Sequence, residues 1–450
     1  MEQFKPSSVA PAHSPAGRGA SPTPARDASS AGATAHGRYL WLMVGLLASV
    51  TIFEGYDVTI FHLCTPDIAR TFHMSDLDVG AMASIVRLGE MMAFVVVMLA
   101  DRVGRKPIVS YTVLFYTLFT LMTALSHGLR TFTGFQCLAQ LFLSGEFAVA
   151  TIIISEEFPD RWRGRGVAIL NMTGLVGVIA GGLLYGPVAG SRWGWRGMYF
   201  IGIAPLLLVA FLRRNLRETA RFTELKRKHR SETSLVDGLR ENVAQAFRAL
   251  GGPYRGRLLL VAMLWNCVML VGAPAVTFFS LYAIRDRHWT RSQVGSAVVL
   301  AYIIGTFGHV LAGYMLDRVG RKLTTCASYV AGAVAIMLLF QTAGHTAMLT
   351  AMVATVFAFQ GARTATATYS AELFPTEIRA TSYSLTVQLL GRITALLTPV
   401  IIGARSRSLG GLGNAVAAVS IGPVIGAVLV ALFAPETRGK PLEDLSPAAL

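Results

Sequence analysis

The sequence predicts an all-α membrane protein with twelve transmembrane helices, arranged as two pseudo-symmetric six-helix bundles. Three observations lead to this fold class. The 450 residues are 53% hydrophobic and only 14% charged, whereas soluble proteins carry about 25% charged residues. Apolar stretches of about 20 residues, long enough for a helix to cross a bilayer, recur along the chain. Motifs of the first half return in the second half.

The internal repeat is carried by two motifs with one spacing. The sequence DRVGRK at positions 101–106 returns letter for letter at positions 317–322, which is 216 residues later. A Glu-x-Phe-Pro segment that starts at Glu156 returns at Glu372 with the same spacing. Two independent matches at one offset indicate that the chain consists of two related halves.

The expected elements follow from hydropathy along the chain. Residues 1–38 are rich in Ala, Pro, Ser and Gly, and we expect a disordered cytoplasmic tail there. The first bundle, residues 39–213, holds spans at 39–63, 77–100, 107–127, 132–157, 165–190 and 196–213. A polar cytoplasmic loop, residues 214–256, leads to the second bundle, residues 257–434. The second bundle holds spans at 257–284, 292–316, 323–342, 346–372, 379–404 and 412–434, and a cytoplasmic tail follows at 435–450.

The basic residues indicate the orientation of the chain. The net charge of +15 does not indicate a nucleic-acid partner, because Lys and Arg lie between apolar spans and form no solvated basic domain. Segments that are cytoplasmic when both termini face the cytoplasm hold more Lys and Arg than the other loops by roughly three to one. We therefore expect a multi-pass protein of the cell (inner or plasma) membrane with both termini in the cytoplasm.

The repeated motifs also hold the residues that we expect to gate the protein. Gly104 and Gly320 allow a tight turn between two antiparallel helices. The charges around them are expected to form ion pairs that hold one conformation and break when the two halves rock. In the alternative interpretation they only fix topology and turn geometry. The expected gating residues are Asp101, Arg102, Gly104, Arg105, Glu156, Arg163, Asp317, Arg318, Gly320, Arg321, Glu372 and Arg379.

Taken together, these motifs resemble those of the major facilitator superfamily. DRVGRK follows the second and eighth spans, and Glu-x-Phe-Pro with a following Arg ends the fourth and tenth spans. The resemblance covers positions 39–444. The segments YSAELFPTEIR at 369–379 and PETRGKPLE at 435–443 resemble the sugar-porter and metabolite:proton symporter branch. The resemblance implies secondary transport by alternating access between the two halves.

Ionisable residues inside the spans are the candidates for proton coupling, because a charge within a membrane is costly. Glu54 and Asp57 lie three residues apart in the first span and are expected to share a helix face. Arg87 and Glu90 of the second span are expected at a similar depth. We expect Asp57, with Glu54, to carry the transported proton and Arg87 to be its ionic partner. A static buried ion pair is the alternative.

The first span is similar to that of proton-symporting sugar porters, in which the aspartate of Gly-Tyr-Asp pairs with an arginine of the fourth span. Counted back from the Gly-Glu pair that ends at Glu146, the position of that arginine is taken by Gln136. Proton coupling would then depend on Arg87 as the substitute. Glu146 is a further carboxylate candidate, and a hydrogen bond in helix packing is its alternative role.

Two arginines of the second half are the candidate substrate ligands. Arg363 lies in the tenth span and Arg392 in the eleventh, where Arg392 could instead pair with Glu54 or Glu90. An arginine that faces a central cavity can bind a carboxylate with two hydrogen bonds, which favours an anionic substrate. The other expected substrate contacts are polar or aromatic residues whose alternative role is packing. They are Gln136, Asn171, Trp265, Asn266 and Gln388.

The sequence therefore predicts a secondary active transporter rather than an enzyme. We expect proton-coupled symport of a small polar or anionic metabolite, such as an organic acid, by a monomer in the lipid bilayer. No cofactor or metal is expected. The alternatives are a proton-driven efflux antiporter for drugs or metabolites, a sugar:proton symporter and, in a different class, a non-transporting membrane sensor built on the same scaffold.

Overall fold

The computed structural model describes residues 25–157, 160–212, 254–374 and 382–439. These residues form helices joined by turns, and no strand occurs among them. For some residues within these helices, the structure describes the backbone but not the side chain. The chain divides into residues 1–42 and residues 43–450. All contacts given below lie within the second of these units.

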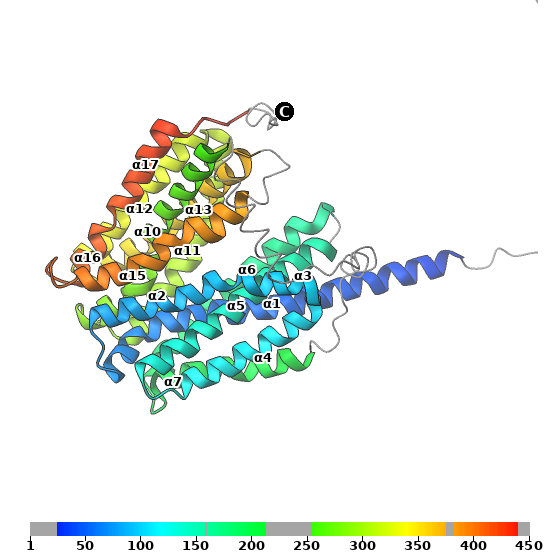
Figure 1. Ribbon diagram of the computed structural model, residues 1–450, viewed down its shortest axis with the longest axis horizontal. Helices are drawn as coiled ribbons and strands as arrows, with labels where there is room; N and C mark the ends of the chain where they lie inside the picture. The colour runs from blue at the N-terminus through cyan, green and yellow to red at the C-terminus, as the bar shows by residue number, and fades with distance from the viewer. Residues whose placement is uncertain (1–24, 158–159, 213–253, 375–381, 440–450) are drawn as a thin grey trace, which may run out of the picture. The chain divides into compact units, whose positions relative to one another are not determined.

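The described part of the first half begins with α1 and ends with α7 (Figure 1). The helices are α1 (Ala25–Thr71), α2 (Asp76–Met92), α3 (Phe94–Val103), α4 (Arg105–Ala124), α5 (Leu129–Glu157), α6 (Asp160–Ala189) and α7 (Gly194–Leu212). A capping box starts α2. The Ser75 hydroxyl accepts the backbone N–H of Asp78, and the Asp78 carboxylate accepts the backbone N–H of Ser75. This exchange satisfies N–H groups that a helix start leaves unpaired.

The described part of the second half repeats this pattern. It contains α10 (Arg255–Arg285), α11 (Arg291–Arg318), α12 (Arg321–Gln341), α13 (His345–Glu372), the π-helix η2 (Ser384–Leu389), the 3-10 helix η3 (Leu390–Arg392), α15 (Ile393–Arg405), α16 (Leu412–Ala418) and α17 (Ile421–Phe433). Thr290 and Gln293 form a capping box before α11, at the place that corresponds to the start of α2. Gly104 and Gly320 both adopt a φ of +119°. These matched local structures confirm that the halves are related.

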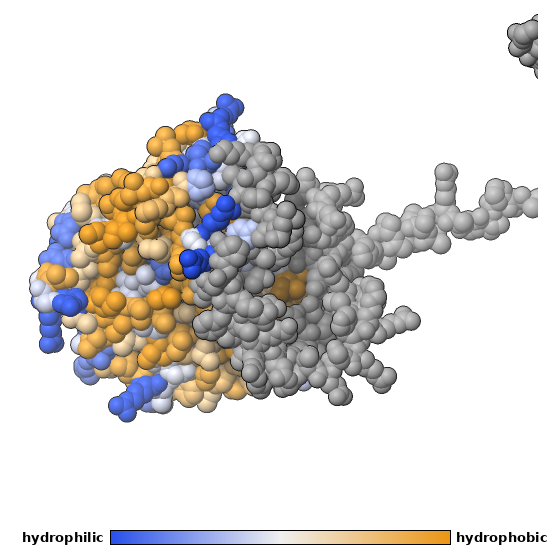
Figure 2. Space-filling model, turned by 45° about the horizontal axis from the view of Figure 1, so that its top comes forward, coloured by the Kyte–Doolittle hydropathy of each residue, from blue (hydrophilic) through white to orange (hydrophobic). Residues whose placement is uncertain are grey.

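As far as its residues are described, each of the twelve expected spans falls on one helix or on consecutive helices. In the described part of the chain, nine helical segments are long and apolar enough to cross a membrane. Figure 2 shows one face of the molecule. Apolar residues, in orange, cover much of its described surface, and most hydrophilic residues, in blue, lie toward the margins of that surface. Val310, Leu432 and Phe433 are among the apolar side chains of the described residues that are more than half exposed, at 67%, 68% and 67%. A surface of this kind suits contact with lipid chains.

Three segments differ from the expected elements. Helix α1 begins at Ala25, so residues 25–38 of the expected disordered tail are helical, and alanine, which is frequent there, is the best helix former. The expected second span is interrupted at Ala93, where α2 ends and α3 follows. The expected last span is divided between α16 and α17.

The expected eleventh span, residues 379–404, is irregular in its described part, where η2 and η3 precede α15. Asn266 of α10 stabilises this irregular segment. Its amide donates to the carbonyl oxygen of Leu390 at 2.8 Å and accepts the backbone N–H of Thr394 at 2.9 Å. The Asn266 side chain thereby satisfies backbone groups at the junction between η3 and α15.

Glycines bring helices of the two halves into backbone contact. Helix α2 packs on α15, as Figure 1 shows, and α6 packs on α11. A Cβ atom on Gly80 of α2 would lie 2.2 Å from the carbonyl oxygen of Pro399 on α15. A Cβ atom on Gly182 of α6 would lie 2.9 Å from the carbonyl oxygen of Gly295 on α11. Small residues allow such crossings between membrane helices.

These contacts lie toward one end of the molecule, which we call the Thr71 end. It is the end at which α1 and α10 finish and at which α2 and α11 begin. The opposite end, which carries the turns at Gly104 and Gly320, is called the Gly104 end. The two halves are thus in close contact at the Thr71 end.

Candidate functional site

Asp57 lies on α1 with only 1% of its surface exposed. Its carboxylate accepts an amide N–H from Gln140 at 2.8 Å and one from Gln136 at 3.3 Å. Both glutamines belong to α5 and lie one helical turn apart, so they reach the same carboxylate. Gln136 therefore faces Asp57. Gln140 is a partner that the sequence analysis missed, although its four-residue spacing from Gln136 was an available signal.

Arg87 is not paired with Asp57, contrary to the expected ion pair. Its Nη2 donates to the hydroxyl of Thr277 on α10 at 3.2 Å, which links the first half to the second. Its Nη1 lies 4.0 Å from a carboxylate oxygen of Glu90. The expectation rested on similar depth in the membrane, but Arg87 faces α10 rather than the interior of the first half. The partners of Asp57 in the described chain are neutral.

Glu54 has different neighbours from Asp57, although the two residues are three positions apart. The charged groups that act on Glu54 are Glu90 of α2, Glu146 of α5 and Arg392 of the second half. Glu146 is fully buried. Two carboxyl groups from α2 and α5 and one arginine of the second half therefore act on Glu54.

Arg363 of α13 has an exposed side chain. Its guanidinium stacks over the ring of Phe359 at 5.6 Å and approaches Gln360 at 3.5 Å. Arg392 is close enough to act on its charge. Within the described residues, neither arginine has a carboxylate within 4.0 Å.

Two of the expected substrate contacts serve the packing of the second half. Trp265 is 5% exposed, and its indole N–H donates to the hydroxyl of Ser370 at 2.8 Å. The amide of Asn266 holds the junction before α15, as described above. Both side chains are therefore occupied by other helices. The side chains of Asn171 and Gln388 lie outside the described residues.

The gating residues of the second half form a cluster at the Gly104 end. Arg321 binds Glu372 with an N–O distance of 2.8 Å, and its Nη1 lies 3.7 Å from Asp317. Glu436, which follows α17, accepts the backbone N–H of Arg321 at 2.9 Å. Arg318 packs over the ring of Tyr314 and takes no part in the cluster. For the remaining expected gating charges, the side chains lie outside the described residues: Asp101, Arg102, Arg105, Glu156, Arg163 and Arg379.

Two ion pairs at the Thr71 end join the two halves. Asp67 of α1 binds Arg291 of α11 at 2.5 Å, and Asp76 of α2 binds Arg285 of α10. Sequence analysis missed both pairs. In each pair the two residues come from different halves and lie near helix ends. A charged residue at a helix end is usually solvated, and the sequence pattern there does not identify its partner.

The family model for the Major Facilitator Superfamily matches residues 47–399 of this chain. The chain belongs to the Major Facilitator Superfamily. The cis,cis-muconate transport protein of Acinetobacter baylyi is 24% identical over 91% of this chain and 98% of its own length. The benzoate transport protein of the same organism is 23% identical over 91% of this chain and 92% of its own length.

A solved structure shares the fold of this superfamily member. The xylose transporter XylE from E. coli, in an inward-open conformation, superimposes with a TM-score of 0.70 at 18% identity. The match covers 90% of this chain and 99% of that chain. With the helices above, these comparisons make the protein an integral, multi-pass membrane transporter of small molecules and not an enzyme.

Proposed function

We propose that this superfamily member transports an organic anion together with protons. The observation that supports an anionic substrate is the pair of arginines in the second half. Arg392 acts on the charge of Arg363, and no carboxylate of the described residues lies within 4.0 Å of either guanidinium, although Arg392 also acts on Glu54. Two neighbouring cations in a membrane interior are costly. A substrate carboxylate would offset that cost and accept two hydrogen bonds from a guanidinium.

The names of the two relatives support the same substrate class. One is described as a transporter of cis,cis-muconate and the other as a transporter of benzoate. Both compounds are small carboxylates with a flat, unsaturated carbon skeleton. We extend the class, an organic anion, to this chain.

Proton coupling is supported by the surroundings of Asp57. In the ionised state its carboxylate accepts amide N–H groups from Gln136 and Gln140. Among the described residues, the amide oxygens of these two glutamines have no hydrogen-bond partner. A protonated Asp57 could donate to such an oxygen, because an amide presents both a donor and an acceptor. The site can therefore stabilise both states of the carboxyl group without moving a charged partner.

We propose that Glu54, Glu90 and Glu146 form the second proton-binding group. Glu90 and Glu146 act on Glu54, and so does Arg392, which also acts on Arg363. An anion bound at the two arginines would then change the field felt by these acids. Such a link provides the coupling between substrate and proton that symport requires.

The transport cycle that we propose is alternating access in a monomer of the cell membrane. Both termini face the cytoplasm, so that the Thr71 end is the outer end. The close contacts and ion pairs at this end then belong to a state that is closed to the outside. The Arg321 and Glu372 cluster at the Gly104 end belongs to the cytoplasmic side.

Uptake into proteoliposomes tests the anionic substrate. Wild-type protein should accumulate a labelled carboxylate from a panel that includes benzoate and cis,cis-muconate, with xylose as the neutral compound. Arg363→Gln should lower carboxylate uptake at least about tenfold, because a charged hydrogen-bond pair is lost. Arg407→Gln, which changes an exposed arginine after α15, is the matched control. Wild-type uptake by Arg363→Gln, or transport of xylose alone, would refute the proposal.

A further inference from the structure

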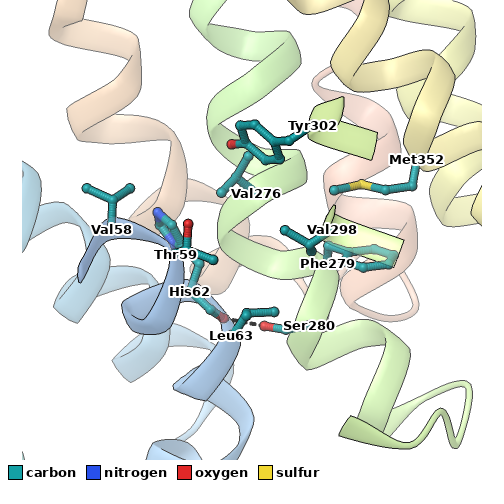
Figure 3. A pocket seen from close by; sticks show the side chains of 10 residues that line it. All are labelled: Val58, Thr59, His62, Leu63, Val276, Phe279, Ser280, Val298, Tyr302 and Met352. Carbon is teal, nitrogen blue, oxygen red and sulfur yellow. Dashed lines mark hydrogen bonds between the residues drawn. The ribbon is translucent and has the colours of Figure 1, made fainter. Parts of the chain in front are cut away.

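One face of α11 is turned toward the first half. Its residues follow one another at alternating spacings of four and three, which places them in one row along a helix. The row comprises Gly295, Val299, Tyr302, Thr306, His309 and Gly313. Toward the Thr71 end, a Cβ atom on Gly182 of α6 would lie 2.5 Å from the Val299 side chain. Tyr302 follows and lines a small pocket with Thr59 of α1 (Figure 3). His309, two turns further along, therefore faces the space between the halves.

Thr364 of α13 holds the imidazole of His309 beside Arg363. The Thr364 hydroxyl lies 2.8 Å from Nδ1 of His309. Phe359, one turn earlier on α13, faces α10, because a Cβ atom on Gly272 of α10 would lie 2.4 Å from its ring. The guanidinium of Arg363 stacks over this ring. Successive residues are about 100° apart around a helix, so Arg363 projects between the directions of α10 and α11.

The hydrogen bonds of Thr364 fix the tautomer of His309. The Thr364 hydroxyl donates its hydrogen to the carbonyl oxygen of Gln360 at 3.1 Å. A hydroxyl group has one hydrogen, so the same oxygen accepts from His309. Nδ1 of His309 therefore carries a proton, and in the neutral ring Nε2 carries only a lone pair. Nε2 has no hydrogen-bond partner among the described residues.

Few charged groups surround this imidazole. Helices α6, α10, α12 and α13 pack against α11. Of the charged groups that the structure describes on these helices, only Arg363 acts on His309. Tyr302 is the other titratable residue of the row, and the charged side chains of α6 lie outside the described residues. A Cβ atom on Gly313, one turn beyond His309, would meet no described atom within 4 Å, so the row borders open space there.

We propose that His309 binds a further proton together with the substrate anion, because its protonated Nε2 donates to the carboxylate that Arg363 holds. The inference rests on the proposed function, since it assumes an anion at Arg363. It adds a proton-binding residue within the substrate site. The lone pair of a neutral Nε2 repels a carboxylate oxygen, whereas a protonated Nε2 attracts it. The anion in turn offsets the repulsion between two cations and so favours protonation. Each ligand therefore strengthens binding of the other.

The KM of benzoate exchange tests this coupling in proteoliposomes that hold the full chain. The pH is equal on both sides and is varied between about pH 6 and pH 8, where imidazoles titrate and benzoate stays ionised. In wild type, KM should rise at least about tenfold over this range as His309 loses its proton. In His309→Gln it should change less than about twofold, because glutamine donates a hydrogen bond but does not titrate. His127→Gln, at an exposed histidine between α4 and α5, is the matched control and should keep the wild-type profile.

A second pair of variants tests the hydrogen bond that positions the imidazole. Thr364→Val removes the hydroxyl that accepts from Nδ1 and should raise KM at about pH 6 roughly fivefold. Thr364→Ser keeps the hydroxyl and should stay within about twofold of wild type. Equal KM values in these two variants would overturn the proposal, even if His309→Gln fails to fold.

The pH profiles separate this inference from the proposed function. A wild-type KM that is constant over the range overturns the role of His309, and so does a His309→Gln profile equal to that of the wild type. In both cases the anion site at Arg363 stands if Arg363→Gln still lowers benzoate uptake. If the wild type transports no carboxylate of the panel, the proposed function itself fails.

Discussion

Asp67 and Arg291 form a bidentate ion pair that joins α1 of the first half to α11 of the second. Nε of Arg291 lies 3.1 Å from both carboxylate oxygens of Asp67, and Nη2 lies 2.5 Å from one of them. Tyr185 of α6 donates its hydroxyl to the same carboxylate at 3.0 Å. Asp67 is 8% exposed. A paired charge at this level of burial is expected to hold the Thr71 end closed.

Asp67→Asn should therefore shift the protein toward a state that is open at the Thr71 end. Loss of a charged hydrogen-bond pair costs about 1.5–3 kcal/mol, which corresponds to at least about a tenfold change in populations. Cys64 lies one turn before Asp67 and is fully buried. Its rate of labelling by a water-soluble maleimide should rise about tenfold once the other three cysteines are replaced. Arg291→Lys, which keeps the charge, should raise the rate less. An unchanged rate in Asp67→Asn would rule out this role of the pair.

Asp57→Asn should uncouple transport from the proton gradient. The asparagine can keep the hydrogen bonds with Gln136 and Gln140, but it cannot take up or release a proton. Accumulation driven by a pH gradient should fall at least about tenfold, while exchange of substrate for substrate without a gradient should continue. The two assays on one preparation separate coupling from folding. Gradient-driven accumulation at the wild-type level would exclude Asp57 as the proton carrier.

Asn266→Ala should destabilise the fold of the second half. The substitution leaves the carbonyl oxygen of Leu390 and the N–H of Thr394 without their partner. A buried polar group that loses its hydrogen bond costs about 1–3 kcal/mol, so the midpoint of thermal unfolding in detergent should fall by several degrees. Asn414→Ala, at an exposed asparagine, is the control and should change the midpoint little. Equal midpoints for the two variants would contradict the structural role of Asn266.

Gly320→Ala should also be destabilising. Gly320 has a φ of +119°, and a Cβ atom there would lie 2.9 Å from a carboxylate oxygen of Glu436. Backbone strain of this kind costs about 1–3 kcal/mol. The control is Gly313→Ala on α11, where a Cβ atom meets no other atom within 4 Å. That change should leave stability equal or raise it by about 0.5–1 kcal/mol. A greater loss of stability in the control than in Gly320→Ala would contradict this prediction.

Glu436 should make stability depend on pH in the acid range. Burial tends to raise the pKa of its carboxyl group, but hydrogen bonds from the backbone N–H groups of Arg321, Lys322 and Arg438 outweigh burial and hold the pKa below its ordinary value. A carboxyl whose pKa is lowered on folding stabilises the protein above the unfolded pKa, which is about 4.3 for glutamate. That stabilisation is lost as the pH falls through the folded pKa.

Thermal unfolding of wild type and Glu436→Gln between pH 3 and pH 7 measures this effect. The difference between the two midpoints should be greatest at neutral pH and shrink below about pH 4.3 as the wild-type carboxyl is protonated. A difference that stays constant over the whole range would show that Glu436 acts only through packing.

Sequence reasoning predicted the fold because its signals are local. Hydropathy over about 20 residues marks a span, and a glycine in DRVGRK marks a turn. Both copies of that glycine, Gly104 and Gly320, have a positive φ of +119°, which suits such a turn. The η2 and η3 segment was not predictable in the same way. Its stability depends on Asn266, which lies more than one hundred residues earlier in the chain.

The sequence by itself determined that this chain is a duplicated helical membrane protein and which of its spans carry Asp57, Arg87 and Arg363. Only the tertiary structure decided the partners of these residues. Asp57 binds Gln140 rather than Arg87, and Arg87 reaches Thr277 of the other half. The physical reason is that a side chain's partner depends on the rotation and crossing of two helices, and neither is contained in the hydropathy or spacing of either helix alone.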